Sequence, residues 1–132
     1  MALTARGTPL QTARRASGWL HIALAAAVVV GVFVQVYLIG AYVFGAGTGA
    51  LDAHRTVGFT VHALEVLTFV TALVAWLPRA DVGLSALLAV VGTAQLALAS
   101  ASAWTGALHP LGALFVLVIA ALLARRGLRR RA

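Results

Sequence analysis

The sequence of 132 residues has no cysteine and little charge. Without cysteine, disulfides, iron–sulfur clusters and thiolate metal sites are excluded, and histidine is the one soft metal ligand that remains. Charged residues make up 10% of the chain, against about 25% in an ordinary soluble domain. No Gly-Lys-Ser/Thr or G-x-G-x-x-G pattern follows a strand, so the glycines form no nucleotide-binding fingerprint. No enzymatic activity is indicated.

Hydrophobic residues dominate what is present. They make up 62% of the chain, and the mean hydropathy is +1.00, so the lipid bilayer is expected to be part of the solvent. A helix needs about 20 apolar residues to cross a bilayer. The stretches of that kind are 19–44, 57–77, 82–104 and 108–124. Their short connections, with Asp52 as an N-cap and residues 78–81 as a turn, predict an all-α, polytopic up-down-up-down four-helix bundle.

The distribution of arginine predicts the orientation of this bundle. The net charge is +7, all ten basic residues are arginines, and Arg55 alone falls on the outer side. Both termini are therefore expected in the cytoplasm, in a multi-pass protein of the bacterial cytoplasmic (inner) membrane. The predicted parts are a basic arm (1–18), a transmembrane domain (19–124) and an arginine-rich tail (125–132). The cytoplasmic arginines are Arg6, Arg14, Arg15, Arg79, Arg125, Arg126, Arg129, Arg130 and Arg131. Anionic lipid, and not nucleic acid, is their expected partner.

The two halves of the chain share a pattern. Each half reads a glutamine, a turn, a histidine and then a glycine about one helical turn later. These residues are Gln35, His54 and Gly58 in the first half and Gln95, His109 and Gly112 in the second. Two hairpin repeats related by an axis along the membrane normal would place the two histidines at equal depth.

The second span carries polar residues on one face. His54, Gly58, His62, Glu65 and Phe69 are spaced by four, four, three and four residues, so they share a side of the helix. Counting inward from the outer ends puts His62 and Glu65 in one layer with the two glutamines. Glu65 is expected to be protonated or hydrogen-bonded to His62, Gln35 or Gln95. This layer is either functional or a set of hydrogen bonds that joins helices, and the cytoplasmic half is expected to be apolar.

A haem b site is one interpretation of the histidines. His54 and His109 would be the metal ligands, Gly58 and Gly112 would leave room for the macrocycle, and Arg55 would meet the propionates. His62 is expected to be a hydrogen-bond partner beside this site. The alternative is that His54 and His109 are interfacial residues at helix N-termini. His21 is expected to be interfacial too, since no histidine lies opposite.

The segments Gln35–Gly40, Asp52–Arg55 with Gly58, and Gln95 with Leu108–Gly112 resemble those of a family of small, uncharacterised four-helix bacterial membrane proteins of the actinobacterial type. More distantly, the histidine–glycine arrangement is similar to that of cytochrome b561-like haem-binding bundles. That resemblance implies haem b. Such proteins carry one histidine pair per leaflet, whereas this chain offers one pair, which cannot alone carry electrons across ~30 Å of hydrocarbon.

Three functional classes follow. The chain is a haem protein that exchanges electrons with a quinol/quinone or a larger respiratory partner, an accessory membrane subunit without chemistry, or a small proton-coupled exporter that uses Glu65. No GxxxG pair lies within one span, so the sequence gives no oligomeric state.

Overall fold

The computed structural model describes residues 8–131, and they are helical apart from short loops. The helices are α1 (Pro9–Val43), α2 (Thr48–Val74), α3 (Arg79–Leu98), the short α4 (Ala103–Gly106) and α5 (Leu108–Arg129). Four segments are long and apolar enough to cross a membrane, namely α1, α2, α3 and the stretch Ala103–Arg129. The predicted all-α architecture with four membrane-length helices is confirmed.

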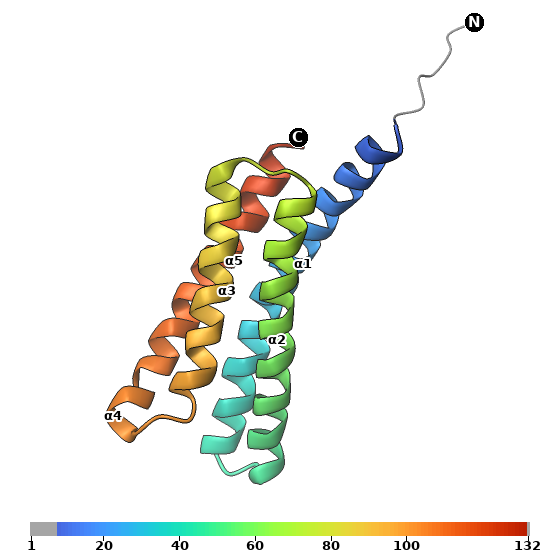
Figure 1. Cartoon of the computed structure of the whole chain (residues 1–132). Helices are drawn as coiled ribbons and strands as arrows, with labels where there is room; N and C mark the ends of the chain where they lie inside the picture. Colours follow the sequence, from blue (N-terminus) through green and yellow to red (C-terminus); the bar gives the residue numbers. More distant parts are fainter. Residues whose placement is uncertain (1–7, 132) are drawn as a thin grey trace, which may run out of the picture.

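The four long helices form a ring. α1 packs against α2 and α5, and α3 packs against the same two helices. Figure 1 shows the loops around α4 and between α1 and α2 at one end of the bundle. The α2–α3 loop and the last turns of α5 lie at the other end. We call the first the histidine end, because it holds His54 and His109, and the second the arginine end, because it holds Arg126 and Arg130.

The helix boundaries differ from the predicted spans at the α1–α2 connection. α2 begins at Thr48, well before residue 57, because Gly45 and Gly47 turn the chain with positive φ angles of 92° and 84°. Asp52 therefore lies inside α2, and its prediction as the N-cap was wrong. It pairs instead with Arg55 at 3.2 Å, one helical turn later on the exposed surface.

The basic arm and tail are also more helical than expected. Thr8 caps α1, because its Oγ1 accepts from Gln11 N at 3.3 Å while Gln11 Oε1 accepts from Thr8 N at 3.0 Å. The helix thus includes residues 9–18 of the arm, and α5 runs on to Arg129 in the tail. Residues 1–7, with the predicted cytoplasmic Arg6, and residue 132 lie outside the described residues.

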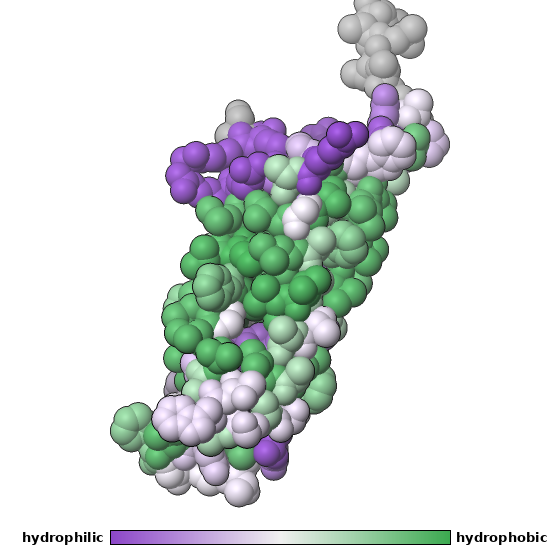
Figure 2. Space-filling view, turned by 60° about the vertical axis from the view of Figure 1, so that its left-hand side comes forward, coloured by the Kyte–Doolittle hydropathy of each residue, from purple (hydrophilic) through white to green (hydrophobic). Residues whose placement is uncertain are grey.

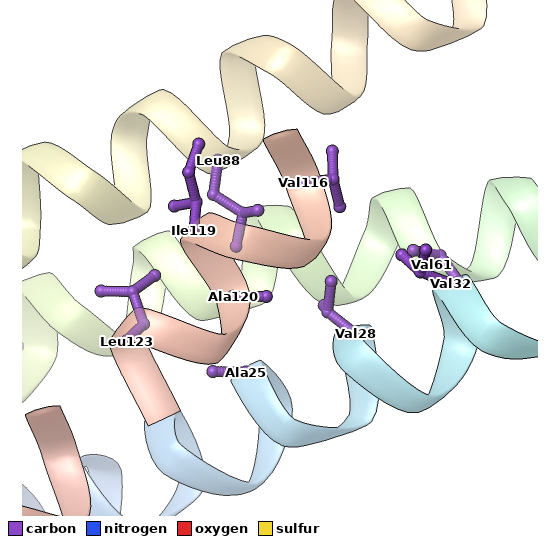
Figure 3. Close-up of a cluster of buried hydrophobic side chains, with 9 residues drawn as sticks. All are labelled: Ala25, Val28, Val32, Val61, Leu88, Val116, Ile119, Ala120 and Leu123. Carbon is purple, nitrogen blue, oxygen red and sulfur yellow. The ribbon is translucent and has the colours of Figure 1, made fainter. Parts of the chain in front are cut away.

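An apolar core fills the middle of the ring, and larger apolar side chains cover the outside. The core residues that Figure 3 labels are Ala25, Val28, Val32, Val61, Leu88, Val116, Ile119, Ala120 and Leu123. On the face in view, Figure 2 shows a broad hydrophobic band along the bundle and hydrophilic side chains gathered at the arginine end. On this outer surface, the side chains of Val30, Phe33 and Phe115 are each more than 60% exposed. An apolar outer surface of this extent suits lipid as the solvent.

Gly31 sets the approach of α1 to α2, which gives a test of the packing. A Cβ at Gly31 would lie 2.5 Å from Cγ2 of Val61, a β-branched side chain with little freedom to move. We expect Gly31→Ala to lower the free energy of unfolding by about 1–3 kcal/mol through overpacking. The matched control is Gly40→Ala on the same helix, where nothing lies within 4 Å. Thermal unfolding in detergent measures both, and equal stability of the two variants would contradict the packing described.

Candidate functional site

The two histidines of the repeated pattern meet at the histidine end. His54 lies near the start of α2 and His109 in the first turn of α5, and both are half-buried. Their ring centroids are 6.3 Å apart, and the ring planes stand at 71° to each other. Residues from the two halves of the chain therefore form one pair of imidazoles.

Each imidazole is held by the glutamine of its own hairpin. His54 Nδ1 lies 3.1 Å from Gln35 O, and His109 Nδ1 lies 3.1 Å from Gln95 O. A backbone carbonyl only accepts, so Nδ1 is the donor in both bonds. In the neutral form of each ring, this bond selects the tautomer in which Nε2 keeps its lone pair. The same contact at the same distance recurs in both hairpins.

The glycines of the repeat also behave alike, since each makes room for a glutamine side chain. A Cβ at Gly58 would lie 2.7 Å from Gln35 Nε2, and a Cβ at Gly112 would meet Gln95 Oε1. The room expected for a macrocycle is thus filled by two amides. Gln95 Nε2 donates to His109 O at 2.8 Å, whereas the Oε1 atoms of both glutamines are buried without a partner. Two unpaired buried acceptors are unusual, and either ordered water or a ligand that donates hydrogen bonds would satisfy them.

The predicted polar layer is present next to the histidine pair. Glu65 is 2% exposed, and its Oε2 lies 3.0 Å from His62 Nδ1, so the expected hydrogen bond is confirmed. A cavity of about 80 Å³ lies between the helices. Its polar lining comprises Gln35, His62, Glu65, Gln95 and His109. The His62–Glu65 pair and His109 therefore line the same cavity.

One expected contributor lies at the edge of this site. Arg55 follows His54 directly and is exposed, with its guanidinium on Asp52. Within residues 8–131, no three His, Asp or Glu side chains gather to hold a metal ion. The histidine pair would therefore need a group that brings its own further ligands.

Comparisons with known proteins give no identification. No protein-family model, curated protein or solved structure matches the chain. The interpretation of the site rests on its residues.

The arginine end contains polar residues that were not expected there. His21 is fully buried, and its Nδ1 donates to Thr68 O at 3.0 Å, so its interpretation as an interfacial residue was wrong. Asp81 is also fully buried, in the first turn of α3 and not in a turn before it. Arg126 Nε donates to its Oδ1 at 2.6 Å, and Arg130 pairs with its Oδ2. The expectation of an apolar cytoplasmic half was wrong.

The sequence does carry signals for these contacts. His21, Ala25, Val28 and Val32 are spaced by four, three and four residues, so the histidine shares the face of α1 that forms the core. Arg126 and Arg130 are four residues apart and thus present two guanidinium groups on one side of α5. A lone buried carboxylate needs such a partner.

Gly92 provides a test of the polar layer. A Cβ at this position would occupy the place of Glu65 Oε2 and lie 2.9 Å from His62 Nδ1. We expect Gly92→Ala to separate the pair and to lower the free energy of unfolding by about 1–3 kcal/mol. Nitrogen NMR of the His62 imidazole measures the loss of the hydrogen bond. Gly83→Ala, on the same helix with nothing within 4 Å, is the control, and an unchanged His62 signal in Gly92→Ala would refute this arrangement.

Proposed function

We propose that the chain is a multi-pass protein of the bacterial cytoplasmic membrane, folded as an up-down-up-down bundle with both ends in the cytoplasm. The four membrane-length helices and the arginines at one end support this orientation, since positive charge is retained in the cytoplasm. Two tryptophans fit the interfacial positions that this orientation requires. Trp76 in the α2–α3 loop is 73% exposed, and Trp104 in α4, at the other end, is 91% exposed.

The absence of cysteine allows a direct test of this orientation. Gly49→Cys places one thiol at the histidine end, where nothing lies within 4 Å, and Arg129→Cys places one on the exposed side of the arginine end. In intact cells, a membrane-impermeant maleimide is expected to label Gly49→Cys and to leave Arg129→Cys unlabelled until the membrane is opened. The reverse labelling pattern would invert the proposed topology.

We propose further that the histidine end binds one haem b through His54 and His109. The observation that carries this proposal is the pair of imidazoles, each with Nδ1 on a backbone carbonyl and Nε2 left as a ligand atom. A histidine that binds a metal usually donates its other ring N–H in this way. Metal–nitrogen bonds of about 2.0–2.1 Å would place two such rings about 6 Å apart, close to the 6.3 Å observed. Two imidazoles that bind one metal from opposite sides can be rotated freely relative to each other, so the interplanar angle of 71° is compatible with such a site.

The surrounding residues fit this group in several respects. No third protein ligand is present within residues 8–131, and a porphyrin would bring nitrogen ligands of its own. Gly58 and Gly112 flank the pair, and the side chains of Gln35 and Gln95 that fill the space beside them would have to move, with loss of the bond from Gln95 Nε2 to His109 O. Arg55 would hold the propionates. His62 and Glu65 would adjoin the haem from deeper in the bundle.

Haem would supply one-electron exchange with a quinol or a larger respiratory partner. This chain has one histidine pair, at one end. Electron transfer across the ~30 Å hydrocarbon layer is therefore not part of the proposal.

An absorption spectrum tests the haem site. Full-length protein, produced with haem supplementation and purified in mild detergent, is expected to show a Soret band. His54→Ala and His109→Ala should each remove most of this band, because both imidazoles would be needed to hold the haem. His21→Gln, at the opposite end, should keep it. Colourless wild-type protein, or a full Soret band in the double alanine variant, would overturn the proposal in favour of an accessory subunit or a Glu65-dependent exporter.

A further inference from the structure

A second cavity lies at the arginine end, away from the histidine pair. Its volume is about 240 Å³, and it is bounded by α1, the α2–α3 loop and the last turns of α5. Pro78 and Gly18 contribute to its wall, and His21, Arg130 and Arg131 contribute its polar side chains. Nothing in the proposed haem function uses this cavity.

His21 has an unused ring nitrogen at this cavity. The residue is fully buried, and its Nδ1 is engaged by Thr68 O, which also accepts from Thr71 Oγ1 at 3.0 Å. Nε2 is buried without a hydrogen-bond partner. A buried polar atom left unpaired is costly, so a ligand that satisfies Nε2 would recover that free energy. Nε2 can accept from a hydroxyl or, in the imidazolium form, donate to an oxygen.

The charge at this cavity is positive even when the carboxylate that pairs with Arg130 is counted. That carboxylate belongs to Asp81, which is outside the cavity lining and is shared by Arg126 and Arg130. Arg131 is an additional cation, with no acidic partner among the ion pairs of residues 8–131. Its guanidinium lies 4.4 Å from the Trp19 ring centroid and donates to Arg15 O at 3.5 Å. Most of the five donors of a guanidinium thus remain available on both Arg130 and Arg131.

A glycine in α1 admits Arg131 to the cavity. A Cβ at Gly18 would collide with Arg131 Nη2. Gly18 is itself buried, so the guanidinium lies against the backbone of α1. His21 follows about one helical turn later. The sequence thus brings two guanidinium groups and an unpaired imidazole nitrogen to one cavity.

We propose that this cavity binds a phosphate group, with Arg130 and Arg131 donating to its oxygens and His21 Nε2 accepting from a hydroxyl, either on the phosphate itself or on the headgroup that carries it. Guanidinium groups match phosphate in charge and in hydrogen-bond geometry. The cavity lies at an end of the membrane spans, where phospholipid headgroups are found. A lipid headgroup and a free phosphate offer the same chemistry, and the experiment distinguishes them.

Binding to full-length protein, purified in detergent and stripped of lipid, tests this site. Inorganic phosphate is titrated by calorimetry, and phosphatidylglycerol is titrated by native mass spectrometry. We expect Arg131→Gln and His21→Gln each to weaken binding about tenfold, which corresponds to about 1.4 kcal/mol. Arg125→Gln removes the same charge from the exposed side of α5, outside the cavity, and should keep the wild-type affinity.

The outcomes separate the sources and the alternatives. Binding of phosphatidylglycerol alone assigns the site to a lipid headgroup, and binding of both probes assigns it to the phosphate group itself. Gly18→Ala displaces Arg131 without changing the charge, so it should lower affinity as well, and it decides the matter if His21→Gln fails to fold. Failure of both probes to bind, or an equal loss in Arg125→Gln, would overturn the proposal. The haem spectrum is independent of these results.

Discussion

Polar groups inside this bundle have to be satisfied by the protein, because the hydrocarbon around it offers no hydrogen bonds. The four long helices satisfy their own backbones, so the constraint falls on the side chains of the few polar residues within the spans. These residues are confined to two levels, one at each end of the apolar core. At each level a histidine donates Nδ1 to a backbone carbonyl, from His54 and His109 at one end and from His21 at the other. Carbonyls and imidazoles, more than ion pairs, connect the helices where the core stops.

The two hairpins solve the same packing problem with the same residue types. A glutamine on the first helix offers its carbonyl to a histidine on the second, and a glycine on the second helix leaves space for the glutamine side chain. The connecting loops differ, since residues 99–107 include α4 while residues 44–47 are a short turn with two positive-φ glycines. The similarity therefore lies in the contacts between helices and not in the turns. This arrangement places two identical side chains, His54 and His109, next to each other where the two hairpins meet.

The sequence was sufficient for the parts of the structure that depend on periodicity. Long apolar stretches predicted the four spans, and the spacing of His62 and Glu65 predicted both their common face and their hydrogen bond. Helix ends were less predictable. Gly47 starts α2 well before the apolar stretch begins, and the charged residues that follow it are still helical. Neither helix propensity nor hydropathy locates a helix start of this kind. The polar first turns of α2 precede the apolar stretch, and their residues are acceptable both in a helix and in a loop.

His21 and Asp81 were misjudged for a different physical reason. Each lies near the end of an apolar stretch, and position along a span does not distinguish a side chain that faces lipid or water from one that faces the core. That distinction depends on which helices are neighbours. Asp81 is buried because α5 lies beside α3 and carries Arg126 and Arg130 at matching height. Such a match between residues more than forty positions apart appears only once the helices are placed.

The clamp of Asp81 by Arg126 and Arg130 also has a consequence for biogenesis. The chain is made from its N-terminus, so the carboxylate of α3 is complete long before either guanidinium exists. Until the last turns of α5 are added, Asp81 has no partner within the ring and is better placed in water than in lipid. Closure of the ring at the arginine end is thus a late event in synthesis, in which the final helix both seals the core and neutralises the charge at its edge.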